Sequence, residues 1–289
     1  MQQLLHQILS GLATGGIYAS VALALVMIYQ ATHLVNFAQG EMAMFATYLA
    51  WALMQAGVPY WGAFAITVVS AFALGVAIER IIVRPVENSP ILALVIVFIA
   101  LLVIFNSLAG WIFTYTIKPF PSPFPEQPLF GNSYLSSHEL GSMAITLIVL
   151  LLLFVFFRFT PLGLAMRAAA QNPVSSRLVG IRVGWMLALG WGLAAAIGSI
   201  AGMMVAPTVF LEPNMMGGIL LYAFAGALLG GIDSPGGAVL GGFIVGVLEN
   251  VVGIYVGSEL KLTFALVVIV TVLVIKPSGL FGKVHVVRV

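Results

Sequence analysis

The sequence has little charge and no cysteine. Of its 289 residues, 7% are charged and 62% are hydrophobic, and the mean hydropathy is +1.15. A soluble domain has about a quarter of its residues charged. This composition therefore excludes a soluble fold of this size and predicts a polytopic membrane protein. Without cysteine, the chain has no disulfide, thiol nucleophile or cysteine-ligated metal site.

The sequence also lacks the motifs of enzymes and nucleotide-binding proteins. No GxxxxGKS or GxxxxGKT phosphate loop occurs, so we expect no cofactor on this chain and no ATP bound through such a motif. A transport protein of this kind is a channel, an ion-coupled carrier or one subunit of a complex powered by other subunits. No Ser/His/Asp set or pair of carboxylates forms a catalytic motif. The four histidines are scattered, which argues against a metal site. The net charge of +2 does not call for a nucleic-acid partner. We predict a transport protein rather than an enzyme.

Long apolar runs are abundant. Many approach the ~20 residues that cross ~30 Å of hydrocarbon as an α-helix. They predict an all-α polytopic membrane protein with about nine transmembrane helices (8–10) in a single domain, residues 1–289. Two of the candidate spans are weak. Gly217–Ile232 is short for a full crossing, and Phe37–Ala56 begins at a polar cluster. The remaining runs are Leu4–Tyr29, Trp61–Ile82, Ile91–Phe113, Leu140–Phe157, Gly184–Pro207, Ala238–Val256 and Leu262–Ile275.

Lysines and arginines predict the orientation, because cytoplasmic loops are enriched in them. The loop Arg158–Arg182 carries four arginines and no acid. If this loop is inside and nine spans alternate, nine of the 11 lysines and arginines are cytoplasmic and only Lys118 and Lys261 lie outside. The N-terminus is then outside and the C-terminus cytoplasmic. The proline-rich segment Pro119–Pro128 becomes an external loop.

Glycine is concentrated in the second half of the chain. Ten of the thirty residues from Gly217 to Gly246 are glycine, and small residues let helices approach closely in lipid. Pairs at four-residue spacing, such as Gly226 and Gly230, predict tight helix packing; smooth faces that slide during gating are the alternative. The turn signature Asp233–Gly237 predicts a helical hairpin.

A few polar residues fall within or beside the predicted spans. Polar groups are costly at membrane depth and therefore suggest a function. Glu41 lies at the inner end of the second span, where an acid in a first helical turn also complements the helix dipole. We predict that these residues either line a translocation pathway or pack helices together. They are Asn36, Glu41, Asn106, Glu249 and Asn250.

Residues 158–183 form the predicted cytoplasmic coupling loop. Thr160-Pro161 and Asn172-Pro173 are cap-then-proline helix starts, and a glycine stop ends the predicted short helix Pro173–Val179. A basic anchor on anionic lipid is the alternative, but it would not require two capped helices. Docking of another protein is therefore favoured. The residues assigned to docking are Arg167, Asn172, Pro173, Arg177 and Gly180.

Several short motifs follow one another in a recognisable order. Together they resemble the LivH-type membrane permeases of branched-chain amino acid ABC importers, nearly from end to end. The motifs are GGIYA (15–19), VNFAQGEM (35–42), GLAMRA (163–168), QNP (171–173), LVGI (178–181), LGGI (229–232), GGAVLGG (236–242) and KPSGLFG (276–282).

The resemblance implies a multi-pass subunit of the bacterial inner membrane. Its implied partners are a second homologous permease, two cytoplasmic ATPases and a periplasmic binding protein, with the helix around Pro173–Val179 resting in a groove of the ATPase. The implied function is import of branched-chain or other hydrophobic amino acids into the cytoplasm. A urea or short-amide ABC permease, or an autonomous secondary carrier or channel, stays open as an alternative.

Overall fold

The computed structural model describes residues 2–32, 35–87, 89–125 and 136–282, and within them the chain is helical. The one pairing of extended backbone there is an isolated bridge between Lys118 and Leu211. The all-α prediction is therefore confirmed. The α-helices are α1 (Gln2–Thr32), α2 (Gln39–Gln55), α3 (Tyr60–Ile78), α4 (Ile91–Phe113), α5 (Ser137–Phe159), α6 (Pro161–Gln171), α7 (Pro173–Leu178), α8 (Val183–Val209), α9 (Met215–Gly230), α10 (Pro235–Tyr255) and α11 (Lys261–Ile275).

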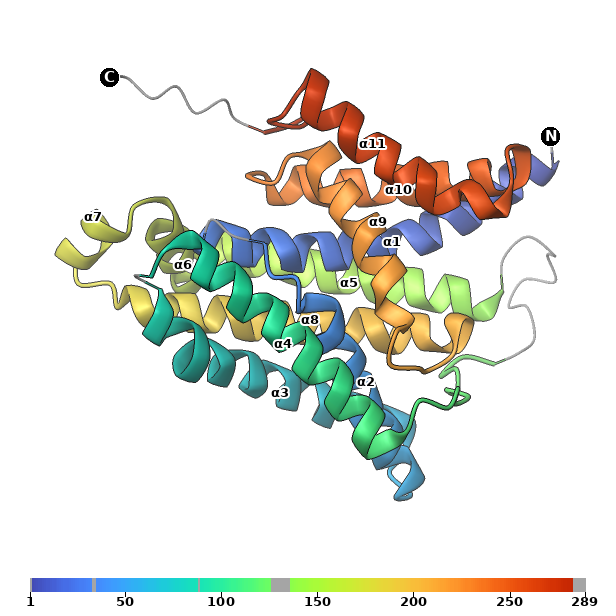
Figure 1. Ribbon diagram of the computed structural model, residues 1–289, viewed down its shortest axis with the longest axis horizontal. Coiled ribbons are helices and arrows are strands. Elements are labelled where there is room, and N and C mark those ends of the chain that lie inside the picture. The colour runs from blue at the N-terminus through green and yellow to red at the C-terminus, as the bar shows by residue number, and fades with distance from the viewer. Residues whose placement is uncertain (1, 33–34, 88, 126–135, 283–289) are drawn as a thin grey trace. The chain divides into compact units, whose positions relative to one another are not determined.

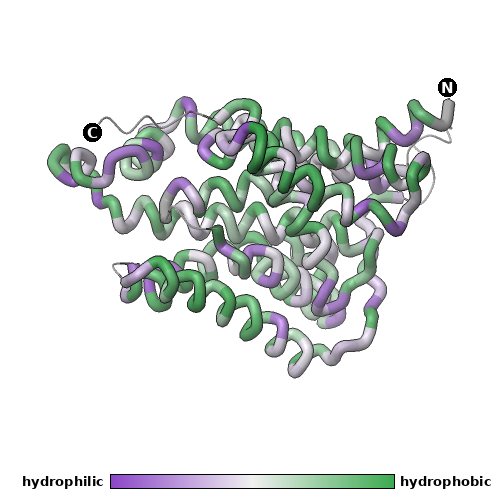
Figure 2. Tube along the Cα trace, turned by 45° about the horizontal axis from the view of Figure 1, so that its top comes forward, coloured by the Kyte–Doolittle hydropathy of each residue, from purple (hydrophilic) through white to green (hydrophobic). Residues whose placement is uncertain are grey.

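Seven helical segments of the described residues are long and apolar enough to cross a membrane. The shorter helices α2 and α9, of 17 and 16 residues, fall at the two predicted spans that looked weakest. The count of nine spans stays a prediction. Figure 2 shows that hydrophobic residues dominate the helices and that hydrophilic ones gather near helix ends and turns. The seven segments are Leu4–Gln30, Tyr60–Val86, Ile91–Phe113, Ser137–Phe159, Val183–Val209, Pro235–Tyr255 and Ser258–Ile275.

Two predictions fall partly outside the described residues. Of the proline-rich segment Pro119–Pro128, residues 119–125 are described and contain no helix, as predicted, whereas 126–128 lie outside the description. The basic residues Lys283 and Arg288 lie in the undescribed end of the chain.

The chain divides into two compact units, and the boundary passes through α1, α5 and α9. The first unit contains residues 1–26, 124–146 and 218–289; the second contains 27–123 and 147–217.

The second unit is built around α8, much of which is buried. Helix α3 runs alongside α8 (Figure 1). Gly75 makes this close contact possible, because a Cβ there would lie 2.5 Å from the carbonyl oxygen of Trp191. The fully buried Trp191 ring also packs against Phe98 of α4, with ring centroids 5.7 Å apart. Small residues thus bring α3 to α8, and large apolar side chains fill the space between α4 and α8.

The first unit is held together by glycine contacts among α1, α9 and α10. A Cβ on Gly15 would lie 2.9 Å from the Cα of Phe243, and a Cβ on Gly226 would lie 2.7 Å from the Cα of Gly242. The predicted α9–α10 hairpin is confirmed, and Ser234 caps α10 by accepting a hydrogen bond from the Gly237 N–H at 3.1 Å. The close contacts support the predicted packing role of these glycines.

Helix α5 begins with a capping box. The Ser136 N–H donates to Glu139 Oε2 at 2.8 Å, and the Glu139 N–H donates to Ser136 Oγ at 3.1 Å. This reciprocal pair satisfies donors that a helix N-terminus otherwise leaves open. Ser10 of α1 adds a hydrogen bond to Glu139 Oε1 at 2.5 Å. Glu139 therefore has a structural role.

Candidate functional site

Helix α2 begins about half-way along α8, not level with its start. Gln39 Nε2 donates to the carbonyl oxygen of Ala194 at 2.9 Å. Ala194 is the twelfth of the 27 residues of α8, which places it roughly 16 Å along that helix at about 1.5 Å per residue. Thr47, two turns further along α2, lies against Gly202, two turns further along α8. The two helices therefore run parallel, and α2 accompanies only the second half of α8.

Glu41 was predicted at the inner end of the second span, which was itself a weak candidate because it begins at a polar cluster. Glu41 lies in the first turn of α2, so it is level with the middle of α8. The hydropathy of 37–56 could not show how deep this end of the span lies, because a residue buried in lipid and one buried in protein are equally apolar. Only the contact with Ala194 places the start of α2.

Asn36 shapes the start of α2. Its Oδ1 accepts a hydrogen bond from the Ala38 N–H at 3.1 Å, and its carbonyl oxygen accepts one from the Gln39 N–H at 3.2 Å. The side chain is fully buried. Of its two predicted roles, these contacts favour the structural one, because a local turn that satisfies backbone donors needs no further partner.

Glu41 forms part of a polar cluster with Asn106 of α4 and the α8–α9 connection. Asn106 Nδ2 lies 3.4 Å from Glu41 Oε2, 3.0 Å from the Pro213 carbonyl oxygen and 3.1 Å from Asn214 Oδ1. An amide nitrogen has two hydrogens, so it cannot serve three acceptors equally, and the longest contact is the one to Glu41. Sequence reasoning singled out Glu41 and Asn106 separately, and the structure brings them together.

Part of this cluster is open. Glu41 is 7% exposed, whereas Asn214 is exposed. Gly217, in the first turn of α9, is also exposed, and a Cβ there would have nothing within 4 Å. Sequence reasoning did not identify Asn214. The sequence feature that could have identified Asn214 is its position in a short break between two apolar helices. Non-helical backbone at membrane depth lines cavities or is covered by protein.

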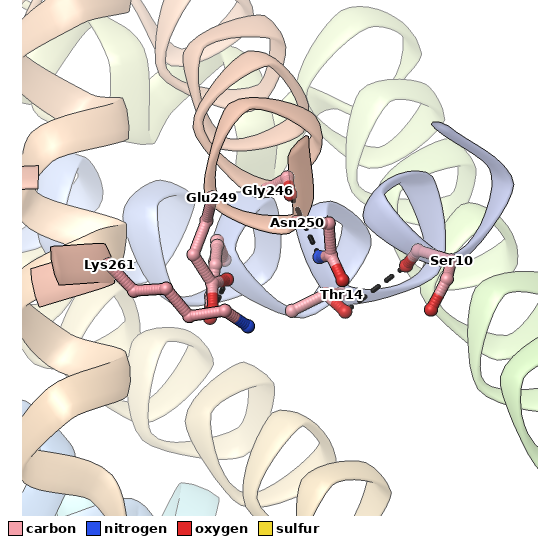
Figure 3. A network of polar contacts seen from close by, with 7 residues as sticks. Ser10, Thr14, Gly246, Glu249, Asn250 and Lys261 are labelled. Atoms are coloured by element: carbon pink, nitrogen blue, oxygen red, sulfur yellow. Dashed lines mark hydrogen bonds and ion pairs between the residues drawn. The ribbon is translucent and has the colours of Figure 1, made fainter. Parts of the chain in front are cut away.

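Glu249 belongs to a second network, in the first unit (Figure 3). Lys261 Nζ lies 3.1 Å from Glu249 Oε1. The Tyr18 hydroxyl donates to Glu249 Oε2 at 2.7 Å. The Tyr18 ring stacks on Tyr222, with centroids 5.1 Å apart. The carboxylate thus has a cationic partner and a hydroxyl donor, which offset the cost of burying it.

Among the described residues, the Asn250 side chain bonds to its own helix and not to this network. Its Nδ2 donates to the Gly246 carbonyl oxygen of its own helix at 3.0 Å, and the neighbouring Thr14 hydroxyl donates to the Ser10 carbonyl oxygen at 3.1 Å (Figure 3). Both side chains thus donate hydrogen bonds to backbone carbonyl oxygens of their own helices. This arrangement fits helix packing better than a pathway role for Asn250.

The α6–α7 segment has the predicted caps. Thr160 Oγ1 accepts from the Gly163 N–H at 3.0 Å, and Asn172 Oδ1 accepts from the Ser175 N–H at 2.9 Å. Pro161 and Pro173 occupy the first helical positions. Gly180 has a positive φ of 84° just after α7, a conformation that glycine adopts without strain. The helix starts and the stop are therefore confirmed.

The surface of α7 is more apolar than the arginine pattern suggested. Val174, Leu178 and Val179 are 69%, 84% and 76% exposed. Arg177 is exposed beside them, whereas Arg167 of α6 is half-buried and its Nε has no partner among the described residues. Sequence reasoning chose the arginines and missed the apolar residues. The sequence did contain a sign of this surface: Val174 and Leu178 are four residues apart, on one face of a helix, in a segment too polar to be a span.

Comparison with known proteins identifies the family. A model of the branched-chain amino acid transport system permease component matches residues 7–274. The chain belongs to this family. The predicted resemblance is thereby confirmed, and the chain is a transport component with the several apolar helices of a multi-pass membrane protein.

Curated relatives cover from 91% to 99% of the chain. The high-affinity branched-chain amino acid permease LivH of Escherichia coli is 30% identical over 300 residues, which cover 99% of this chain and 97% of LivH. BraD of Pseudomonas aeruginosa is 30% identical over 302 residues, 99% of this chain and 98% of BraD. A probable LivH of Methanocaldococcus jannaschii is 26% identical over 278 residues, 91% of this chain and 87% of that protein.

A solved structure supports the fold alone. PsaBC from Streptococcus pneumoniae, in complex with Fab, aligns with a TM-score of 0.51 at 14% identity, over 93% of this chain and 91% of that chain.

Proposed function

We propose that this permease component is the membrane subunit of an ABC importer that moves branched-chain or other hydrophobic amino acids into the cytoplasm. The proposal is supported by relatives from Escherichia coli, Pseudomonas aeruginosa and Methanocaldococcus jannaschii whose names specify branched-chain amino acid transport. Separate ATPase subunits supply the energy, because the sequence has no phosphate loop of its own. A second homologous permease and a periplasmic binding protein complete the complex.

The observation that carries the coupling part of the proposal is the exposed apolar surface of α7. Three large aliphatic side chains exposed on and just after a six-residue capped helix are typical of a surface that another protein covers. The coupling loop is 158–183, and its contacts with the ATPase involve Arg167, Asn172, Pro173, Arg177 and Gly180. Val174, Leu178 and Val179 add the apolar part.

The proposed topology is nine spans in one domain of the bacterial inner membrane, with the N-terminus outside and the C-terminus in the cytoplasm. The seven long segments and the shorter α2 and α9 add up to nine. Helix α2 is then a partial crossing that begins near mid-membrane. Broken helices of this kind surround substrate paths in transporters, and Glu41 and Asn106 line that path.

The absence of cysteine gives a clean test of the topology. Val174→Cys on α7 and Ile117→Cys in the loop after α4 each introduce a single thiol at an exposed position. A membrane-impermeant maleimide should label Ile117→Cys in intact spheroplasts and Val174→Cys only after permeabilisation. The reverse pattern would overturn the orientation and the docking surface together.

Reconstitution tests the transport function. The complete complex in proteoliposomes should concentrate leucine when ATP and loaded binding protein are supplied. This chain reconstituted alone should not concentrate leucine under an imposed proton or sodium gradient. Gradient-driven uptake by the isolated chain would identify it as a secondary carrier and refute the importer proposal. Uptake of urea or acetamide in place of leucine would refute the proposed substrate class.

A further inference from the structure

We propose that Glu41 is the group that receives the α-ammonium group of the transported amino acid near the middle of the membrane. The inference rests on the proposed function and adds a specific cation-accepting residue to the path. It follows from three features of the second unit: the depth of Glu41, its lack of a cationic partner among the described residues, and the open side of its cluster.

The depth comes from α8. Helix α8 is long and apolar enough to span, and α2 starts beside Ala194, near its middle. A carboxylate in the first turn of α2 therefore lies well inside the hydrocarbon layer. Ionised carboxylates at such depth are costly and are found paired or facing a water-filled path.

The charge of Glu41 is unpaired, in contrast to the other buried carboxylates of the described residues. Glu249 has Lys261 at 3.1 Å, and Glu79 has an arginine, Arg84, at 3.4 Å. Glu41 is as buried as Glu249, but among the described residues its carboxylate receives only the 3.4 Å hydrogen bond from Asn106. The cation that would balance it must come from outside the described chain, and a zwitterionic amino acid carries one.

The hydrogen bonds around Glu41 allow a substrate to replace Asn106 as the donor to its carboxylate. Asn106 Nδ2 already lies closer to the Pro213 carbonyl oxygen and to Asn214 Oδ1 than to Glu41. It can therefore release Glu41 without being left unpaired, which is the costly outcome for a buried donor. The Asn214 amide is exposed and provides N–H donors for the carboxylate of the same amino acid.

Glu41→Gln tests the assignment, because glutamine has the shape of the protonated acid and cannot balance a cation. The complete complex, with both permeases, both ATPases and leucine-loaded binding protein, is reconstituted in proteoliposomes. We expect Glu41→Gln to lower leucine uptake per ATP hydrolysed by about tenfold or more, as for loss of a charge-assisted hydrogen bond. Stimulated ATP hydrolysis and the thermal stability of the complex should stay near the wild-type values. Glu41→Asp should retain part of the uptake.

Glu87→Gln is the matched control, since it neutralises an exposed acid away from the cluster and should transport normally. Wild-type uptake by Glu41→Gln would overturn the inference and leave the proposed function standing. Failure of Glu41→Gln to assemble with the second permease would also overturn it, because the cation would then be a basic side chain of that partner. If the wild-type complex concentrates no amino acid, the proposed function itself is refuted.

Discussion

The side chain of Lys261 lies across Gly253 and brings its ammonium nitrogen within 3.1 Å of Glu249 Oε1. A Cβ at Gly253 would collide with the end of the lysine stem, so the absence of a side chain there leaves the lysine its route to the acid. Because the Tyr18 hydroxyl binds the other carboxylate oxygen, one acid links α1, α10 and α11. Removing any partner should therefore weaken the first unit.

Lys261→Met tests that link, since methionine keeps an apolar stem and removes the charge. It leaves Glu249 buried without a cation, and we expect the free energy of unfolding to fall by about 1–3 kcal/mol, less than for a fully buried pair because the Lys261 side chain is partly exposed. The free energy of unfolding is measured by titration with SDS in mixed micelles. In the double variant Lys261→Met, Glu249→Gln, the loss should be smaller than the sum of the single losses. Strict additivity would show that the two residues do not interact.

Gly241→Leu should separate α9 from α10. A side chain at this position would meet the backbone of Gly226, and its Cβ would lie 2.8 Å from the Gly230 nitrogen. Overpacking of this kind lowers the free energy of unfolding by about 1–3 kcal/mol. The thermal midpoint in detergent reports the change. Gly236→Leu is the matched control, because nothing lies within 4 Å of a Cβ there. Equal midpoints for the two variants would contradict the close contact.

Leu178→Asn should weaken coupling to the ATPase. Leu178 is 84% exposed, so the substitution removes apolar surface without disturbing the interior of the protein. We expect ATP hydrolysis stimulated by loaded binding protein to fall by about tenfold, as at an interface hot spot, with normal membrane insertion. Leu178→Met should retain activity. Arg177→Glu should lower the same activity by reversing a charge on α7. Unchanged stimulation in both Leu178→Asn and Arg177→Glu would place the docking surface elsewhere.

Asn172→Ala should loosen α7 at its start. The alanine cannot accept the hydrogen bond from the Ser175 N–H, and loss of such a cap costs about 1 kcal/mol of helix stability. If the first turn of α7 unfolds, its apolar residues no longer form a fixed surface for the ATPase. ATP hydrolysis stimulated by loaded binding protein should therefore fall by a few-fold. Asn172→Asp keeps the acceptor and serves as the control. If alanine and aspartate behave alike, the cap has no part in coupling.

The two pathway candidates of the first unit illustrate where sequence reasoning stops. Glu249 and Asn250 are neighbours in the chain and received the same prediction. The structure gives Glu249 an ion pair and a tyrosine donor, but leaves Asn250 bonded to its own helix. Adjacent helical residues point about 100° apart, so their partners depend on which helices pack on each side. Hydropathy and local motifs contain no information about those neighbours.

Composition and local sequence were sufficient to predict the helical membrane fold, the caps of α6 and α7 and the α9–α10 turn, whereas the family came from the resemblance of short motifs along the chain. Each depends on composition or on residues close together in the chain, so the amino-acid order alone determines it. Only the tertiary structure decided three other features. Helix α2 begins beside the middle of α8, Glu41 lies close to Asn106 and Asn214, and the apolar side chains of α7 are exposed. Depth, pairing and exposure depend on contacts between residues far apart in sequence, and those contacts exist only once the helices have packed.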